Sequence, residues 1–409
     1  MNLDKQELVV LRAGELIDSI SDEPRGETEV WIRNGIIEEI RENHTPDSKL
    51  PECTRVVDAT DMTVMPGLID AHVHLCSSAH PDPTTTGRTE SLYRTAVRGT
   101  QNARDTLLGG ITTIRVMGTP DYIDIEIRDL VNNGTIPGPR IHAAGRALSI
   151  TGGHGWYHSI ECDGPAQFKA AARDLIKRGV DAIKIKVTGG VMTPGIRPGV
   201  PQMDRDEIQA VMHEARKRNI PVGGHNEGRQ GIKDAVACGI DSIEHGYFID
   251  DEESIQIMID KGIYLVPTIM AYVLIAEGLD VGVPEEAVEN AQMALDYNQN
   301  SFRMAVEAGV PVAMGSDAGT AFNYHGKSGR ELAYMVKYGM TPMAAIKSAT
   351  IEGAKLLRIS DRVGSIEIGK SADLIAARGR PAENVEDVVD VATVLKGGRV
   401  VKERDIPLV

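Results

Sequence analysis

Cysteine is scarce in this 409-residue sequence, and the placement of its four cysteines excludes two kinds of site. They are far apart and form no Cys-x-x-Cys pair: Cys53, Cys76, Cys162 and Cys238. This pattern argues against a disulfide framework and against a thiolate zinc site. It fits a protein whose thiols stay reduced.

Aromatic residues, positive charge and long apolar runs are also scarce. Aromatic side chains make up 4% of the sequence, too few to suggest stacking platforms for single-stranded nucleic acid. The 44 basic against 59 acidic residues give a net charge of −15, which disfavours nucleic acid or an anionic membrane as a partner. No apolar run approaches the roughly 20 residues of a membrane span, and residues 1–20 lack the apolar core of a secretory signal. We therefore expect a soluble, cytoplasmic protein that binds neither nucleic acid nor membrane.

The two ends of the chain have the same β-rich character. Strand-like runs cover residues 7–18, 28–40 and 53–60, and similar runs return at 363–379 and 391–402. We expect the two ends to meet in one small β-sandwich domain, made of residues 1–64 and 359–409.

The middle of the chain, residues 65–358, alternates between strand-like and helix-like runs. The strand-like runs are 68–75, 111–118, 139–147, 181–190, 220–226, 241–246, 262–268 and 310–319. Helix-like runs lie between most of them, for example 168–178, 205–218 and 285–308. Eight strand–helix units predict an α/β fold, a parallel (β/α)8 TIM barrel. An open doubly wound sheet is the alternative, but no Gly-x-Gly-x-x-Gly opens a helix after the first strand.

Polar residues gather near the carboxyl ends of these strands. His72 and His74 share one face of the first strand, because side chains in a strand alternate with a period of two. Four more candidates follow on later strands: Lys184, His225, His245 and Asp317. Barrel enzymes keep their chemistry at this end, so ligands from five strands can converge on one point.

Imidazoles and a carboxylate suit zinc or a similar divalent ion. Two such ions can share a bridging hydroxide, because bound water has a pKa of about 7. An ammonium at Lys184 would be repelled by the ions, but addition of CO2 to the neutral amine gives an anionic carbamate that could bridge them. Lys186 shares the strand face, so periodicity alone does not choose between the two lysines. Asp317 could bind one ion and accept the proton of the hydroxide.

Simpler interpretations exist for several of these residues. Asp317 could be a capping carboxylate at a strand-to-helix turn. Lys184 could be a solvated lysine at a strand edge, and His154 could bond only to backbone in its glycine loop. The convergence of six candidates in strand order favours the metal site over these interpretations.

The motifs together resemble the amidohydrolase superfamily over nearly the whole chain. They are PGLIDAHVHL, GITTIRVMG, TGGHG, IKIKVTGGVM, SIEHG, GSDAG and IGKSADLI. Within it the chain is similar to the imidazolonepropionase-like branch, with its Xaa-Pro dipeptidases and arginine or lysine carboxypeptidases. The resemblance implies that His72, His74, Lys184, His225, His245 and Asp317 hold two divalent ions, with zinc favoured. It selects Lys184 as the carboxylated lysine and implies a homo-oligomer.

The resemblance also implies a role for His154, in TGGHG, next to the scissile carbonyl or the substrate carboxylate. Relatives often carry an aromatic residue or a second histidine two residues after the histidine of the fifth strand, where this chain has Glu227. Glu227 would repel a substrate carboxylate, although Arg229 could offset it. Tyr157, His158 and Tyr324 are further candidates for substrate contact.

We expect a hydrolase of an amide-type C–N bond in a small molecule, with a dipeptide or N-acyl amino acid as the leading substrate class. Asp317 and His154 are the expected catalytic residues, with a metal-activated hydroxide as nucleophile. One alternative is a cyclic amide, carbamate or urea-like substrate, including xenobiotic compounds. Others are a mononuclear deaminase and a metal-binding scaffold without turnover.

Overall fold

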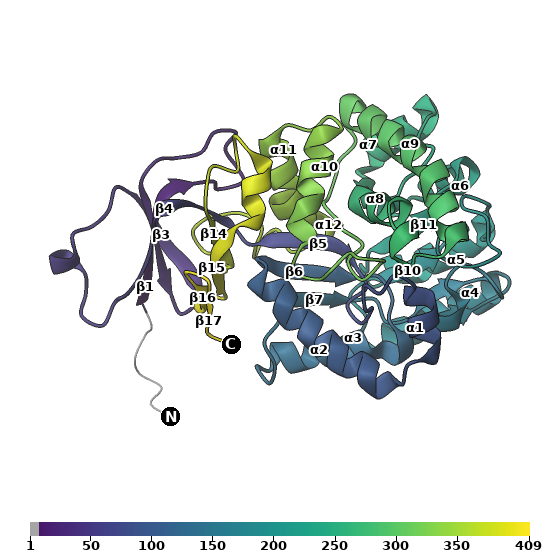
Figure 1. The fold of residues 1–409 in the computed structure, drawn as a ribbon, viewed down its shortest axis with the longest axis horizontal. Coiled ribbons are helices and arrows are strands. Elements are labelled where there is room, and N and C mark those ends of the chain that lie inside the picture. The colour runs from purple at the N-terminus through teal and green to yellow at the C-terminus, as the bar shows by residue number, and fades with distance from the viewer. Residues whose placement is uncertain (1–7) are drawn as a thin grey trace.

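The computed structural model describes residues 8–409. Residues 1–7, the start of the predicted β domain, lie outside the described part of the chain. Both ends of the chain do build one structure, a single hydrogen-bonded sheet of eight strands at one side of the molecule (Figure 1). Its order is β17-β16-β15-β14-β4-β1-β2-β3. The predicted boundaries of the two domains stay a prediction.

The strands of this terminal sheet come from both ends of the chain. They are β1 (Leu8–Leu16), β2 (Thr28–Arg33), β3 (Ile36–Glu42), β4 (Arg55–Pro66), β14 (Leu374–Ala377), β15 (Val391–Lys396), β16 (Arg399–Glu403) and β17 (Ile406–Pro407). The central strand β4 pairs in parallel with β1 and antiparallel with β14. Buried side chains from β1, β4 and β14 share one apolar cluster, so burial as well as hydrogen bonding holds the two ends together.

The rest of the molecule is built on parallel strands. A three-stranded sheet has β5 (Leu68–Val73), β6 (Ile111–Val116) and β7 (Arg140–Ala143). A six-stranded sheet has β8 (Ala147–Ser149), β9 (Ser159–Glu161), β10 (Ile183–Lys186), β11 (Val222–Asn226), β12 (Ser242–His245) and β13 (Tyr264–Val266). The strands are nearly all buried on both faces, as in a parallel sheet covered by helices. The parallel α/β class predicted for the middle of the chain is confirmed.

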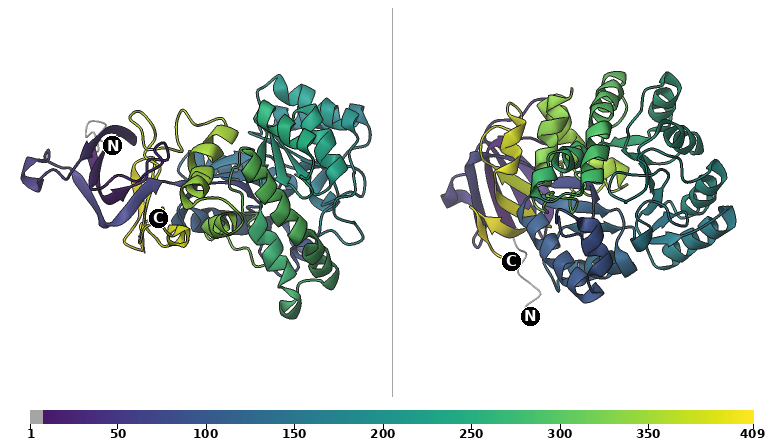
Figure 2. Two further views of the ribbon diagram at one scale, coloured as in Figure 1. Left: turned by 90° about the horizontal axis from the view of Figure 1, so that it is seen from above. Right: turned by 45° about the vertical axis from the view of Figure 1, so that its right-hand side comes forward.

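Helices surround these strands in all three views (Figures 1 and 2). They are α1 (Pro83–Thr89), α2 (Leu92–Leu108), α3 (Ile123–Asn132), α4 (Pro165–Lys177), α5 (Arg205–Arg216), α6 (Arg229–Cys238), α7 (Glu252–Lys261), α8 (Ile269–Ala276), α9 (Glu285–Ala308), α10 (Glu331–Lys337), α11 (Pro342–Lys347) and α12 (Gly353–Leu356). The predicted helix at 285–308 has the observed bounds, and those at 168–178 and 205–218 are each close to an observed helix. In residues 8–409, no helix is both long and apolar enough to cross a membrane.

Two predicted strands take a different form. The run at 139–147 divides into β7 and β8, because Gly145 adopts a positive φ of 66° between them. The run at 310–319 forms no regular strand, only isolated parallel bridges from Val312 to β13 and from Ala318 to β5. These bridges place the segment 310–318 between β13 and β5, where the eighth strand was expected. On the other side, Asp181 of the segment before β10 donates its backbone N–H to Ala143 of β7.

Candidate metal centre

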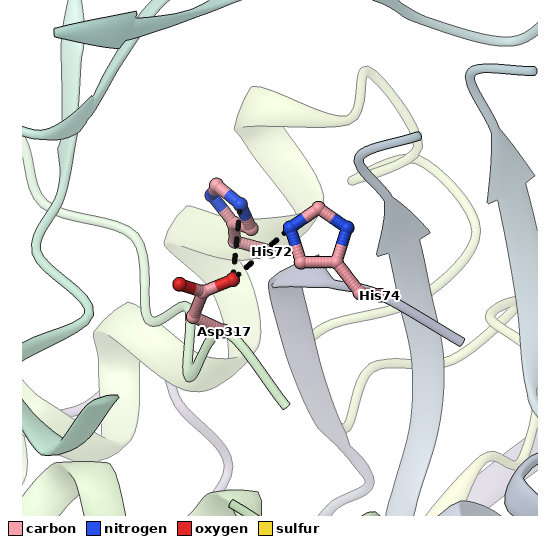
Figure 3. A group of neighbouring side chains, drawn as sticks. All are labelled: His72, His74 and Asp317. Atoms are coloured by element: carbon pink, nitrogen blue, oxygen red, sulfur yellow. Dashed lines mark ion pairs between the residues drawn. The ribbon is translucent and has the colours of Figure 1, made fainter. Parts of the chain in front are cut away.

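The first cluster joins β5 to the segment 310–318. His72 is fully buried in β5, and His74 follows the last residue of that strand. Their Nε2 atoms lie 3.5 Å and 3.2 Å from Oδ1 of Asp317 (Figure 3). Asp317 adopts a positive φ of 59°, while its backbone N–H donates to the carbonyl of His72. This turn interrupts the eighth strand and directs the carboxylate toward the two rings.

The second cluster comes from the next strands along the sheet. His225 lies in β11 and His245 ends β12, with ring centroids 4.5 Å apart. Together with Glu227 they offer three ligand atoms that all lie within 4.8 Å of one another. The ring of His245 is also 5.0 Å from that of His72. The two clusters therefore adjoin.

Lys184 is fully buried in β10, on the strand beside β11. Burial, followed by the charge of Lys186, holds the pKa of its amine well below the ordinary value. The nearby carboxylates Glu244 and Asp317 oppose this shift. A neutral amine is the form that can add CO2, so the environment of Lys184 suits a carbamate.

The donor atoms fit a divalent metal. Within the described residues, four buried atoms of the predicted ligands lack a hydrogen-bond partner: His72 Nε2, Lys184 Nζ, His225 Nε2 and Asp317 Oδ1. A buried polar atom without a partner is costly, and imidazole nitrogen with carboxylate oxygen is a donor set that suits zinc. The residues present therefore fit a metal centre.

Glu244 contacts His72 of the first cluster on the ring nitrogen that does not face Asp317. Its Oε2 lies 2.7 Å from Nδ1 of His72, and its Oε1 accepts a 2.8 Å bond from Nη2 of the fully buried Arg115. Burial raises the pKa of Glu244, but Arg115 and His72 outweigh burial and hold it below its ordinary value. The ionised carboxylate fixes the His72 proton on Nδ1, which leaves the Nε2 lone pair free for a metal.

Two further groups position the ligands. Asp70 accepts bonds from the backbone N–H groups of His72 and Ser316, so it ties β5 to the turn that carries Asp317. Burial raises the pKa of Asp70 to about 6, against several hydrogen bonds that lower it. On the other side, Thr268 Oγ1 lies 2.7 Å from Nδ1 of His245. The contact with Thr268 at Nδ1 leaves Nε2 of His245 facing the centre.

His154 lies at the wall of the cavity above this centre. Its ring stacks on that of His225 at 4.3 Å, and its Nδ1 is 2.9 Å from Oγ1 of Thr193. Burial, followed by the charge of Lys186, lowers the pKa of His154 well below the ordinary value. The ring is therefore a neutral hydrogen-bonding group.

The cavity above the centre has a volume of about 120 Å³. Tyr157 and His158 line it, as do Lys186 and Glu227. Burial raises the pKa of Glu227 to about 8, although the hydroxyl of Tyr272 donates to Oε1 at 2.5 Å. Glu227 is therefore mostly protonated near neutral pH and repels a substrate carboxylate less than the sequence suggested.

The structure does not bring Arg229 or Tyr324 to this cavity. Arg229 begins α6, pairs with Asp250 and leaves 57% of its side chain exposed. The pair with Asp250 turns the guanidinium away from Glu227, so it cannot offset that charge. Tyr324 is 56% exposed and lies outside the cavity lining.

Sequence reasoning missed the residues that support the ligands. Asp70 shares the period-two face of His72 and His74, so the alternation that identified the histidines could have identified it. Arg115 is a lone charge within an otherwise uncharged predicted strand, and a buried charge needs a partner. Glu244 directly precedes His245, but only the tertiary contact with His72 gives it a role.

The chain was compared with known proteins. Residues 63–401 match the amidohydrolase family. A solved Xaa-Pro dipeptidase with bound methionine in its active site is 37% identical, with a TM-score of 0.90 over 97% of this chain and 100% of that one. The ochratoxinase of Aspergillus niger is 28% identical over 98% of this chain and 88% of its own length. The imidazolonepropionase of Geobacillus kaustophilus is 25% identical over 91% of this chain and 89% of its own.

These likenesses span nearly the whole chain and extend over both the terminal sheet and the parallel strands. The resemblance inferred from the motifs is therefore confirmed, and the fold is of the TIM-barrel type. The chain belongs to the amidohydrolase family and is a hydrolase of C–N bonds.

Proposed function

We propose that this protein hydrolyses the amide bond of a dipeptide or an N-acyl amino acid at a centre of two divalent metal ions, with zinc favoured. The observation that carries the proposal is the approach of two ligand clusters, one with His72, His74 and Asp317 and one with His225 and His245. Lys184 is the sixth residue of the set. Two clusters with separate orphaned nitrogen atoms fit two ions better than one.

Lys184 acts as a carbamate in this proposal. The neutral amine attacks CO2, a C–N bond forms, and one proton leaves to solvent. The π bond of one C=O group of CO2 breaks as this bond forms, and the carbamate product would be an anion whose two oxygen atoms could act as metal ligands. The low pKa imposed by burial keeps the amine in the form that can react.

Asp317 and His154 are the side chains that take part in the proposed reaction. Bound metal ions supply polarisation of the substrate carbonyl and a lower pKa for the attacking water. Asp317 accepts the proton of that water at a carboxylate oxygen and delivers it to the leaving nitrogen. The backbone N–H of Gly155 donates to Oγ1 of Thr193, which leaves the Thr193 proton free to donate to Nδ1 of His154. In the tautomer in which Nδ1 accepts from Thr193, the proton of His154 is on Nε2, where it can donate to the developing oxyanion.

The test is the metal content of the purified protein beside the Lys184→Ala variant, together with a substrate panel. We expect about two ions per chain in the wild type and a sharp fall in the variant, because a bridging ligand serves both ions. Lys169→Ala, on the surface of α4, is the matched control and should keep the wild-type content. The panel pairs N-acetyl amino acids and dipeptides with cyclic amides, ureas and neutral anilides.

Two outcomes would overturn the proposal. One ion per chain, unchanged in Lys184→Ala, would contradict the binuclear centre and favour a mononuclear hydrolase or deaminase. Turnover confined to the cyclic amides or ureas would contradict the substrate class.

A further inference from the structure

Lys186 is a second lysine at the centre, with different surroundings from Lys184. Both side chains point to the same face of β10. Lys184 pairs with Gly223 of β11, and Lys186 pairs with His225, two residues further toward the carboxyl end of the strand. Lys186 is among the residues that line the cavity, whereas Lys184 is not. The second lysine therefore faces the space for substrate.

Lys186 is buried, and the carboxyl groups of Asp317, Glu227 and Glu244 act on its charge without direct contact. It is 3% exposed, and no hydrogen bond or ion pair within residues 8–409 involves its ammonium. In the same cavity, Oε1 of Glu227 accepts from Tyr272, while Oε2 makes no hydrogen bond to Lys186 or to any other described residue. A buried cation without an acceptor is costly unless a ligand brings one.

The other strong cation in the cavity wall is not available to a ligand in the same way. Arg98 donates through Nε to the carbonyl of Cys76 and pairs through Nη1 with Glu90. Lys186 instead lies beside Gly155, where a Cβ atom would stand 3.8 Å from the lysine Cε. The loop thus approaches the lysine stem without covering it with a side chain. Of these two cations, Lys186 is the one without a hydrogen bond or ion pair to the described residues.

The spacing along β10 suits a substrate carboxylate. Two residues of a strand span about 6.6 Å, so Lys186 lies roughly that far beyond the level of Lys184. In an N-acyl amino acid the carboxylate carbon is three bonds from the scissile carbonyl carbon, about 3–4 Å away. With the scissile carbonyl at the level of the ligand clusters, the carboxylate extends toward Lys186, whose flexible stem covers the remaining distance.

We propose that Lys186 binds the free carboxylate of the substrate and so restricts the enzyme to C-terminal amino acid residues with an unblocked carboxylate. This inference rests on the proposed function for the orientation of the substrate. It assigns Lys186 to substrate specificity, and it leaves Lys184 as the only lysine ligand of the ions.

The test measures equilibrium binding to the metal-loaded enzyme, so that it does not depend on turnover. The probes are reduced-amide analogues in which CH2 replaces the scissile carbonyl: N-ethyl derivatives of methionine, leucine, arginine and proline. Each is used as the free acid and as the carboxamide. The proteins are the wild type, Lys186→Met, Lys186→Gln, Lys186→Arg and Lys169→Met, whose lysine lies on the exposed face of α4.

We expect the wild type to bind at least one free acid about tenfold or more tightly than its carboxamide, because charge-assisted hydrogen bonds are the strong ones. Lys186→Met and Lys186→Gln should lose this ratio while binding the carboxamide as before. Lys186→Arg should keep part of the ratio and Lys169→Met all of it. A structural defect would weaken both ligands together and leave the ratio unchanged.

Three results would overturn the inference. The first is a wild type without preference for any free acid. The second is an unchanged ratio in both neutral variants, with Lys186→Gln standing in if Lys186→Met does not fold. The third is loss of metal from these variants, which would make Lys186 a ligand. A preference that depends on Lys186 in an enzyme that hydrolyses no amide would instead contradict the proposed function and leave the carboxylate site in place.

Discussion

Asp317 combines two tasks in one side chain. It lies within 3.5 Å of two histidine nitrogens, and it is the expected proton acceptor. Burial raises the pKa of its carboxyl, but His72, His74 and His245 outweigh burial and hold the pKa below its ordinary value. The carboxylate is therefore ionised at neutral pH.

Replacement of Asp317 by Asn tests this role. The amide keeps the shape but cannot accept the proton, so we expect kcat to fall by roughly 10²–10⁴-fold. Steady-state kinetics on the best substrate of the panel, with metal content measured in parallel, gives the answer. Asp361→Asn, at an exposed position, is the control. Wild-type kcat in Asp317→Asn would show that another group moves the proton.

Glu244 offers a test of the support behind the ligands. In Glu244→Gln the carboxylate that fixes the His72 proton is lost, so we expect metal affinity to fall by about 10–100-fold. Competition with a chromophoric chelator measures it. Glu253→Gln, in the first turn of α7, should match the wild type. Equal affinity in the two variants would mean that His72 holds its tautomer without Glu244.

At the residue scale, the sequence could bring out the candidate ligands but not their surroundings. His72, His74, His225 and His245 stand at strand ends, where periodicity and the barrel rule both apply. The environment of Glu227 depends on Tyr272, which is 45 residues away and reaches it only through α8. Arg229 was assigned to the cavity from its nearness in sequence to Glu227, but its partner Asp250 lies 21 residues further along the chain.

Among the elements, the loop after β10 shows how backbone shape serves the site. A Cβ atom at Gly190 would lie 2.5 Å from Nε2 of His225 and 2.7 Å from Cε1 of His154. The glycine is therefore needed for the close approach of two functional rings to the backbone, and not only for a tight turn.

Gly190→Ala tests this packing. The methyl group must displace one or both rings, and a misplacement of about 1 Å can cost 10²-fold in rate, so we expect kcat/KM to fall by about that factor. The fold should persist, as judged by circular dichroism. Gly26→Ala is the matched control, because its Cβ would meet no atom within 4 Å. Unchanged kcat/KM in Gly190→Ala would show that His154 and His225 need no fixed distance.

The sequence predicted most strands because short, mostly apolar runs are buried on both faces of parallel strands, as in β5, β6 and β10. It predicted a regular strand over residues 310–319, where the apolar residues are buried but form only isolated bridges. There the positive φ of Asp317 interrupts the strand and turns the side chain toward His72 and His74. The local sequence pattern does not predict such a turn.

At the scale of the whole molecule, Asp373 connects the terminal sheet to the parallel strands. It precedes β14 and accepts bonds from Nη1 of Arg140 on β7 at 2.6 Å and from Nζ of Lys396 on β15 at 3.1 Å. Burial raises the pKa of Asp373, but Lys396 and Arg140 outweigh burial and hold it below its ordinary value. The charge network therefore contributes to the attachment of the sheet.

Asp373→Asn should lower the free energy of unfolding by about 2 kcal/mol at pH 7, less than a fully buried pair because both cations are partly exposed. The native pKa is depressed, so the contribution is present in full above the unfolded pKa of about 4 and is lost as the pH falls through the lower native value. Urea unfolding between pH 7 and about pH 2 should show a constant difference down to about pH 5 and a progressively smaller difference below it. A difference that stays constant over the whole range would assign the effect to packing.

The terminal sheet also has a consequence for synthesis of the chain. Strand β4 takes β14 as its second neighbour, yet about 300 residues separate Pro66 from Leu374. At a translation rate of about 5–20 residues per second, the unpaired edge of β4 waits roughly 15–60 s on the ribosome. An open edge is a template for pairing with other chains. Polypeptides released before β14 is made should therefore aggregate, and the nascent chain should depend on chaperones that cover strand edges during this interval.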